Sequence, residues 1–416
     1  MATENKKYIP ALRFPEFQND GEWKRCKLSD VAVRKGKKNT KGIELPVYTN
    51  SATSGVISQE DYFDREIVTK ENLVNYGIIE PNDFVYNPRV SVTAPVGPIS
   101  RNKLSRGIMS PLYLIFGFNG GDINFFEHYF KGNSWHNYLR AKANYGARFD
   151  RINIGTKEFM DMPIPYPSLA EQKKIADCLS SLDKYIDATK RKLELLKEHK
   201  KGLMQRLFPA KGKTTPELRF PEFQNDGEWQ IVSLGEITSV VNRRNKSNRS
   251  LPIYSINNAE GFVPQSQQFA GMDSEARGYD ISAYKIIGKH TFAYNPARIN
   301  VGSIGYSGEL KDILISSLYV CFKTMDNVDD DFIMCFFNSY IFNQAVESNV
   351  EGGIRSYLFY ENFSRINIAI PSLYEQKRIA SCITSIEDVI KQTNKQICLL
   401  ETHKNGLLQQ LFPKIK

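Results

Sequence analysis

Two clusters of basic residues are the most distinctive chemical feature of this sequence. The first comprises Arg34, Lys35, Lys37 and Lys38, and the second comprises Arg243, Arg244, Lys246 and Arg249. Each cluster follows a short L-x-[DE]-[VI] pattern, so positive charge recurs at matched places in the two halves of the chain. Such charge suits contact with nucleic-acid phosphates. A solvated charged loop is the alternative, and the residues alone leave both open.

Polar and arginine side chains near these clusters are candidates for contact with base edges. Two polar runs follow an L-P-[VI]-Y sequence: Thr49, Asn50 and Ser51, and Ser255, Asn257 and Asn258. Two arginines, Arg89 and Arg298, follow a Y-N-P sequence, and two more, Arg148 and Arg355, follow glycine-rich turns. Asparagine can pair bidentately with adenine, and arginine with guanine. Ordinary loop positions and structural ion pairs remain the alternatives.

The motifs that would give the chain its own catalysis are missing from the sequence. It contains no G-x-x-x-x-G-K-[ST] nucleotide loop, no G-x-G-x-x-G loop after a strand, no C-x-x-C pair and no H-E-x-x-H. Asn87-Pro88 and Asn295-Pro296 match only the first two letters of the N-P-P-[YF] element of adenine methyltransferases, and Asn-Pro favours a turn. We therefore expect no catalytic residue, no bound cofactor and no metal site.

Composition sets broad limits on the class of protein. The 416 residues carry 55 Lys and Arg against 46 Asp and Glu, a formal charge of +9, and 41% of the residues are hydrophobic. This length predicts several folded units, and the charge weakly favours a polyanionic partner. No signal-peptide pattern or apolar run of membrane-spanning length occurs. We expect a cytoplasmic protein with unpaired cysteines and no membrane association.

The chain is an internal repeat. The twelve letters L-R-F-P-E-F-Q-N-D-G-E-W occur at Leu12–Trp23 and again at Leu218–Trp229. Further matches follow in the same order, and Pro167–Pro209 and Pro371–Pro413 agree at 22 of 43 positions. Between these landmarks the two copies differ greatly. One shared scaffold therefore carries two different variable surfaces, as two targets of one kind would require.

Each copy ends in a predicted long helix. Ser168 and Ser372 begin S-x-x-E capping boxes with Glu171 and Glu375. Apolar residues then recur in alternating steps of four and three, and the seams are Ile175, Leu179, Leu182, Ile186, Leu193, Leu196, Leu203 and Leu207 in the first copy, and Ile379, Ile383, Ile386, Ile390, Ile397, Leu400, Leu407 and Leu411 in the second. Thr189 and Lys200, matched by Thr393 and Lys404, interrupt the seams and could set the register. We expect the helices to pair with each other and to stop at Pro209 and Pro413.

The remaining sequence predicts two compact α+β domains. Short β-rich runs such as Leu112–Phe118 and Leu314–Phe322 alternate with Gly, Pro and Asn, and helical patterns occur near 123–142 and 330–348. We divide the chain into an N-terminal segment with a first recognition domain (1–166), a first helical spacer (167–209), a linker (210–217), a repeat segment with a second recognition domain (218–370) and a second helical spacer (371–416).

Taken together, these motifs resemble the specificity subunits of type I restriction–modification enzymes. The resemblance rests on the order W-x4-L-x-[DE]-[VI], Y-N-P and P-S-L-x-E-Q-K-[KR]-I-A, with a long helix ending L-F-P, present twice. It covers essentially the whole chain, and the E-Q-K-x-I-A helix start at Glu171–Ala176 and Glu375–Ala380 is its most specific part.

The resemblance implies a fold and a function. Each variable domain would read one half of a bipartite, asymmetric DNA target, and an antiparallel coiled coil of the two helices would separate the domains and set their spacing. Two methyltransferase subunits, with S-adenosylmethionine and adenine-N6 chemistry, and two motor-nuclease subunits, with ATP and Mg²⁺, would be the protein partners. The subunit itself would catalyse nothing. The repeat also suggests a circular arrangement, in which Leu12–Trp23 closes against the second helix as its twin follows the first.

Two other classes of function remain as rivals at this level. An enzyme with its own methyltransferase or nuclease site would need a cofactor loop or metal cluster that the sequence does not display. A coiled-coil protein without a nucleic-acid role would leave the two large divergent domains unexplained.

Overall fold

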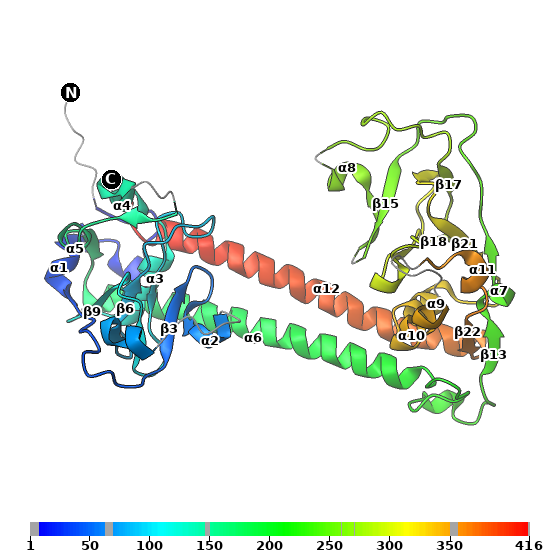
Figure 1. Ribbon diagram of the computed structural model, residues 1–416, viewed down its shortest axis with the longest axis horizontal. Helices are drawn as coiled ribbons and strands as arrows, with labels where there is room; N and C mark the ends of the chain where they lie inside the picture. The colour runs from blue at the N-terminus through cyan, green and yellow to red at the C-terminus, as the bar shows by residue number, and fades with distance from the viewer. Residues whose placement is uncertain are drawn as a thin grey trace. The chain divides into compact units, whose positions relative to one another are not determined.

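The computed structural model of the chain forms two compact units that share one architecture (Figure 1). The structure describes residues 8–62, 70–145, 150–258, 260–269, 271–349 and 357–414. Unit 1 comprises Met1–Lys190 and Lys395–Lys416, and unit 2 comprises Arg191–Asn394. This division cuts through both long helices, so each unit contains part of each one. The domain boundaries drawn from the sequence stay a prediction.

Unit 1 is built on two four-stranded sheets. One has the order β2-β9-β6-β7, and the other has the order β4-β3-β8-β5. Two antiparallel pairs, β1 with β12 and β10 with β11, complete the strands. The strands are β1 (Lys24–Lys27), β2 (Ala32–Arg34), β3 (Val47–Ser51), β4 (Gly55–Ser58), β5 (Gly77–Ile79), β6 (Phe84–Tyr86), β7 (Ile99–Arg101), β8 (Gly107–Met109), β9 (Leu114–Phe118), β10 (Asn144–Tyr145), β11 (Ile152–Asn153) and β12 (Pro163–Tyr166).

Unit 2 repeats the two four-stranded sheets and the β1–β12 pair, and its described residues contain no counterpart of the β10–β11 pair. Its sheets have the orders β14-β21-β18-β19 and β16-β15-β20-β17, and β13 pairs with β22. The strands are β13 (Gln230–Ser233), β14 (Thr238–Val240), β15 (Ile253–Asn257), β16 (Gly261–Pro264), β17 (Lys285–Ile287), β18 (Phe292–Tyr294), β19 (Ile304–Tyr306), β20 (Ile313–Ile315), β21 (Val320–Thr324) and β22 (Asn367–Ile370). The expected β-rich run Leu314–Phe322 is thus two strands, because a turn closed by Tyr319 N–H and Ser316 O breaks it.

Helices complete each unit, and the helical patterns predicted near 123–142 and 330–348 are confirmed. The helices of unit 1 are α1 (Leu28–Val31), α2 (Gln59–Tyr62), α3 (Ile123–Lys131), α4 (His136–Lys142) and α5 (Thr156–Met160), and those of unit 2 are α7 (Leu234–Ile237), α8 (Gln265–Gln268), α9 (Asp330–Phe337), α10 (Tyr340–Asn349) and α11 (Tyr360–Phe363). The long helices are α6 (Leu169–Leu207) and α12 (Leu373–Gln410). The α+β class is therefore confirmed. None of the helices in the described part of the chain has the length and apolar character needed to span a lipid bilayer.

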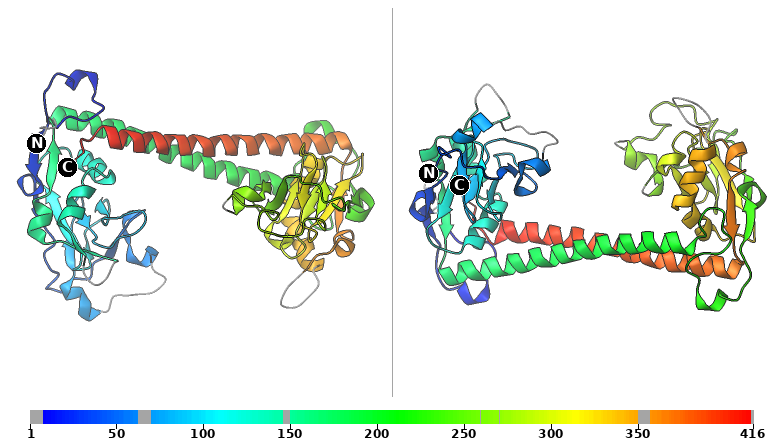
Figure 2. Two further views of the ribbon diagram at one scale, coloured as in Figure 1. Left: turned by 90° about the horizontal axis from the view of Figure 1, so that it is seen from above. Right: turned by 60° about the horizontal axis from the view of Figure 1, so that its bottom comes forward.

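Parts of α6 and α12 lie side by side and antiparallel in each unit (Figures 1 and 2). In unit 1, ion pairs join Asp183 to Lys404 and Lys190 to Glu401, so the numbering rises on one helix as it falls on the other. In unit 2, Lys200 pairs with Glu387. The predicted seam positions are all buried or half-buried, including Thr189 and Thr393. The two threonine hydroxyls donate to the carbonyls four residues earlier, which satisfies them inside an apolar seam.

Each hydrophobic core combines one variable domain with the end of the other copy's helix. The core of unit 1 includes Trp23, Phe125 and Ile175 together with Phe412 from beyond the end of α12. The core of unit 2 includes Trp229 and Phe332 in the same roles, with Phe208 from beyond the end of α6. The main chain is fixed in the same manner: Leu12 N–H donates to Gln410 O at 3.0 Å, and Leu218 N–H donates to Arg206 O at 2.9 Å. The circular arrangement expected from the repeat is confirmed.

The repeated twelve-letter segment docks on the start of the long helix. In unit 1, Arg13 donates from Nε and Nη2 to the carboxylate of Glu171 at 2.7 and 2.8 Å, and both side chains are buried. Arg219 holds Glu375 in the same way in unit 2. The predicted capping box is therefore only half right. Ser168 and Ser372 accept from the expected backbone N–H groups of Glu171 and Glu375. The two glutamate carboxylates, however, accept hydrogen bonds from Arg13 and Arg219 and complete no capping box.

The glutamine of the E-Q-K motif links the long helix to the variable domain. Gln172 Oε1 accepts from the backbone N–H of Asp122 at 2.8 Å, and Gln376 Oε1 accepts from Asp329 N–H at 2.9 Å. Asp122 and Asp329 are in turn the N-caps of α3 and α9. The most specific motif of the sequence is thus a structural node, which fixes how each domain sits on its own helix.

Candidate nucleic-acid interface

The two basic clusters lie on loops that are ordered in the same way. Asn39 and Asn245 are fully buried, and each donates a backbone N–H across the loop, to Tyr76 O and Tyr284 O respectively. The Asn39 side chain bonds both the carbonyl and the N–H of Ile43, and Asn245 does the same with Arg249. Sequence reasoning missed this buried clamp, although asparagine recurs at the same offset in the two clusters. The clamp gives both loops one backbone conformation on which different side chains are displayed.

All eight cluster residues have exposed side chains, but two of them are paired with carboxylates. The other six are Arg34, Lys37, Lys38, Arg243, Arg244 and Lys246. Within the described parts of the chain, none of these six lies in ion-pair distance of a carboxylate. Lys35 instead bonds the buried carboxylate of Asp83 at 2.6 Å, and Arg249 pairs with Asp312 at 3.3 Å. The structure therefore leaves six cations available for phosphate contact, three in each unit, while Lys35 has a structural partner.

Most of the polar-run residues point inward. Asn50 is 2% exposed, and both of its amide hydrogens go to main-chain carbonyls, those of Val85 and Pro98. Buried Thr49 bonds the hydroxyl of Tyr113, and buried Ser255 donates to Gln268 at 2.6 Å. Thr49 and Asn50 therefore anchor β3 within unit 1, and Ser255 anchors β15 within unit 2. The remaining candidates differ in exposure: Ser51 is buried, Asn257 is half-buried and Asn258 is exposed.

The Y-N-P sequences form the predicted turns. Asn87 Oδ1 accepts from Arg89 N–H at 3.0 Å, and Asn295 Oδ1 accepts from Ala297 N–H at the same distance. Arg89 and Arg298 are both exposed, but they do not occupy the same place, because the residue matched to Arg89 is Ala297. Arg148 and Arg355, the other two predicted arginines, lie outside the described residues.

A cleft of about 290 Å³ in unit 1 gathers several of these elements. It lies beside the β3 strand and the Y-N-P turn, and its walls include Thr49, Tyr76, Arg89, Tyr113 and Arg151. Burial and the neighbouring Tyr113 raise the pKa of the Tyr76 hydroxyl, so this tyrosine stays a neutral hydrogen-bonding group. Arg151 was not predicted, because nothing in the sequence shows that it pairs with Arg89. The cleft therefore combines uncharged tyrosine side chains with two cationic ones, Arg89 and Arg151.

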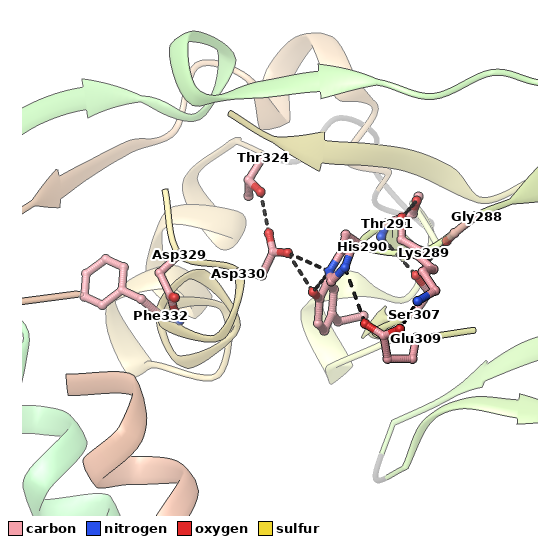
Figure 3. A network of polar contacts seen from close by, with 11 residues as sticks. Gly288, Lys289, His290, Thr291, Ser307, Glu309, Thr324, Asp329, Asp330 and Phe332 are labelled. Carbon is pink, nitrogen blue, oxygen red and sulfur yellow. Dashed lines mark hydrogen bonds and ion pairs between the residues drawn. The ribbon is translucent and has the colours of Figure 1, made fainter. Parts of the chain in front are cut away.

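A polar network in unit 2 ties the β18–β19 hairpin to the first turn of α9 (Figure 3). Tyr306 donates to Asp330 Oδ2 at 2.6 Å, its hydroxyl lies 2.6 Å from His290 Nδ1, and Thr324 bonds the other carboxylate oxygen. Burial, and then the bond to Asp330, raise the pKa of Tyr306. The side chains satisfy one another, so the network anchors the hairpin. In the described portion of the chain no three His, Cys, Asp or Glu side chains are grouped to hold a metal ion.

Comparison with known proteins gives consistent matches along the whole chain. A family model described as the type I restriction modification DNA specificity domain matches residues 20–198 and again 226–401. The type I restriction enzyme MjaVIII specificity subunit of Methanocaldococcus jannaschii is 24% identical over 445 residues, which cover 98% of this chain and 95% of that protein. The putative MjaX specificity subunit of the same organism is 25% identical over 299 residues, covering 68% of this chain and 65% of the relative.

Solved structures show the same fold. The S subunit of a type I restriction–modification system from M. genitalium matches with a TM-score of 0.57 at 15% identity, covering 98% of this chain and all of that one. A chain from a structure describing assembly and conformational transition of the type I R-M system matches with a TM-score of 0.56 at 15% identity, covering 94% of this chain and 97% of that chain.

Proposed function

The chain belongs to the type I restriction–modification DNA specificity family, and from this premise we propose that its two units read the two halves of a bipartite, asymmetric DNA sequence. Unit 1 reads one half and unit 2 reads the other. The paired helices α6 and α12 set the gap between the halves. The chain acts as the specificity subunit of a larger methylating and cutting complex and has no catalytic site of its own.

One observation carries this proposal: a single scaffold displays different side chains at matched places. The buried clamps Asn39 and Asn245 fix the same loop in both units, but the exposed cations around them differ. Phosphate contacts position a protein on DNA, whereas side chains at base edges specify sequence. Two readers that share a backbone but not their surface suit two different half-sequences in one duplex.

The partners follow from the same role. We infer that two methyltransferase subunits, with S-adenosylmethionine, dock along the helices, and that two motor-nuclease subunits, with ATP and Mg²⁺, complete the complex in the cytoplasm. Exposed apolar side chains on both helices support protein docking, since Leu195 is 65% exposed and Leu399 is 61% exposed.

Methylation mapping tests the proposal. Adenine methylation would be mapped by long-read sequencing in cells that carry the methyltransferase subunit with or without this chain. The expected result is one bipartite motif that is present only with the chain. A motif that persists without the chain, or methylation by the purified chain alone, would overturn the proposed function.

A further inference from the structure

Two arginines face one another in unit 1 at a place that the sequence does not reveal. Arg89 follows the Y-N-P turn, and Arg151 precedes β11; the two residues are partners in an isolated antiparallel β-bridge. Bonds from Ile152 N–H to Pro88 O and from Val90 N–H to Asp150 O, both 3.0 Å long, fix the bridge. Residues directly opposite in such a pairing place their side chains on the same face, within contact range. Both side chains line the cleft of about 290 Å³.

This arrangement brings two positive charges together, and among the described residues only Asp150 offers them a carboxylate. Like charges directly opposite one another are destabilising. Arg151 has a single ion pair, a long 3.8 Å contact with half-exposed Asp150, and Arg89 has none among the residues that the structure describes. The Asn87 side chain meanwhile holds the backbone of Arg89 in its turn. The backbone of the pair is therefore preorganised, and within the described residues only the long contact with Asp150 offsets the repulsion.

The rest of the cleft is neutral. Its described lining contains no Asp or Glu, and it presents the rings of Tyr48, Tyr76 and Tyr113 with the hydroxyls of Thr49 and Ser110. The Tyr113 hydroxyl lies 3.1 Å from that of Thr49, so these two groups satisfy one another. The two guanidinium groups are therefore the strongest hydrogen-bond donors that the cleft offers to the acceptor atoms of a ligand.

The matching place in unit 2 has the same backbone hydrogen bond but uncharged residues at the two positions that correspond to Arg89 and Arg151. Leu358 N–H donates to Pro296 O at 3.0 Å, as Ile152 does to Pro88, which aligns Arg151 with Tyr357 and Arg89 with Ala297. Tyr357 stacks on Phe359, with ring centroids 5.7 Å apart and planes inclined by 4°. At these two matched positions unit 1 therefore carries a pair of arginines and unit 2 does not, while unit 2 has Arg298 one residue further along the chain.

We propose that Arg89 and Arg151 are a specificity-determining pair that reads guanine in the half-sequence bound by unit 1. Guanine presents two adjacent acceptors, N7 and O6, in the major groove, and a guanidinium can bond both. Both units must contact phosphates, so a phosphate contact is expected at matched positions in the two units. The arginine pair occurs at this position in unit 1 only, and this favours a role in recognising the half-sequence bound by unit 1. This inference rests on the proposed function. It adds which base is recognised, which two residues recognise it and which half-site contains it.

The test uses the complete methyltransferase complex and compares four changes in this chain: Arg89→Ala, Arg151→Ala, Arg151→Lys and, as a control, Arg140→Ala on exposed α4. Methylated adenines are mapped, and binding is measured on duplexes that carry each base at each position of the motif. The expected result for either alanine variant is the loss of a guanine preference at one position of one half-site, by roughly 5- to 150-fold in relative affinity. The lysine variant recovers only part of the preference, and the second half-site and the Arg140 variant are unchanged.

Other outcomes would overturn the proposal. If the alanine variants weaken binding equally on all sequences and reduce the salt dependence by about one ion per arginine, the pair contacts phosphate instead. An unchanged motif, or a change in the half-site bound by unit 2, would also contradict it. Failure of the proposed function looks different, because the unaltered complex would then show no motif that depends on this chain. A reciprocal variant with Ala297→Arg and Tyr357→Arg should alter only the other half-site.

Discussion

The indole N–H of Trp23 donates to Glu171 Oε2 at 3.0 Å, inside the node that also receives Arg13. The equivalent indole in unit 2 makes no such bond. Trp229 Nε1 is buried and has no hydrogen-bond partner among the described residues, although Arg219 holds Glu375 as Arg13 holds Glu171. An identical twelve-letter sequence therefore meets two different environments.

This asymmetry predicts that the two tryptophans respond differently to the same change. Trp23→Phe removes a hydrogen bond to a carboxylate and should lower the free energy of unfolding of unit 1 by about 1.5–3 kcal/mol. Trp229→Phe removes an unsatisfied buried donor and should cost much less. Hydrogen exchange at the start of α6 and of α12 measures both effects. Equal losses in the two variants would refute the distinction.

The bond from Leu12 N–H to Gln410 O predicts tolerance of circular permutation. In unit 2 the matching connection is the eight residues between Pro209 and Leu218, so a linker of at least eight residues from Pro413 to Leu12 should close unit 1 in the same way. Joining the termini and opening the chain within 210–217 should therefore preserve the fold and the methylation motif. A permuted chain that folds but changes its motif would show that the closure is not equivalent in the two units.

Unit 1 should lose stability in mild acid because of His128. Burial, and then the charge of Lys131, lower the pKa of His128 to about 4, while Asp183 and Glu127 oppose this shift and Lys404 adds to it. A lowered folded-state pKa gives stability that is complete above the unfolded value of about 6.5 and lost as the pH falls toward 4. The loss is at most about 3 kcal/mol.

The variant His128→Gln tests this pH dependence. Its unfolding free energy should fall less between pH 7.5 and pH 5 than that of the unaltered chain, measured by chemical denaturation. Unit 2 has Cys335 at the matched position, six residues after the N-cap Asp329 as His128 follows Asp122, so its stability should not share this component. If the variant and the unaltered chain show the same acid loss, His128 is not its source.

The sequence predicted the elements whose signal is local or repeated. The heptad spacing from Ile175 to Leu207 gave α6, and the identical Leu12–Trp23 and Leu218–Trp229 segments gave the circular closure. It could not predict that Glu171 binds Arg13, which lies 158 residues away in the sequence. The local S-x-x-E pattern instead predicted a capping box between Glu171 and Ser168.

The candidate site was harder to predict for the same reason. Asn50 looked like a base-reading residue in a polar run, but strand pairing turns it into the core, where two carbonyls take its amide hydrogens. Arg151 carried no motif, and only the bridge to Arg89 brings it to the cleft. The side chains available to DNA depend on which face of a strand they occupy and on long-range pairing, neither of which residue type alone determines.

The helices predict a rule for the gap between half-sites. Inserting seven residues after Leu196 and seven after Leu400 keeps the apolar seams in register. Each helix gains about 10 Å, close to three base pairs of 3.4 Å. The complex should keep both half-sequences and prefer a gap longer by about three base pairs, whereas insertions of three or four residues should disrupt assembly. An unchanged gap in an assembled heptad variant would show that the helices do not set it.

Replacing residues 24–166 with the equivalent segment of another specificity subunit, followed by methylation mapping of the assembled complex, tests whether the two units read DNA independently. We expect one half of the bipartite motif to change to that of the donor, while the half read by unit 2 keeps its sequence. A motif in which both halves change together would contradict the claim that the two units read DNA independently.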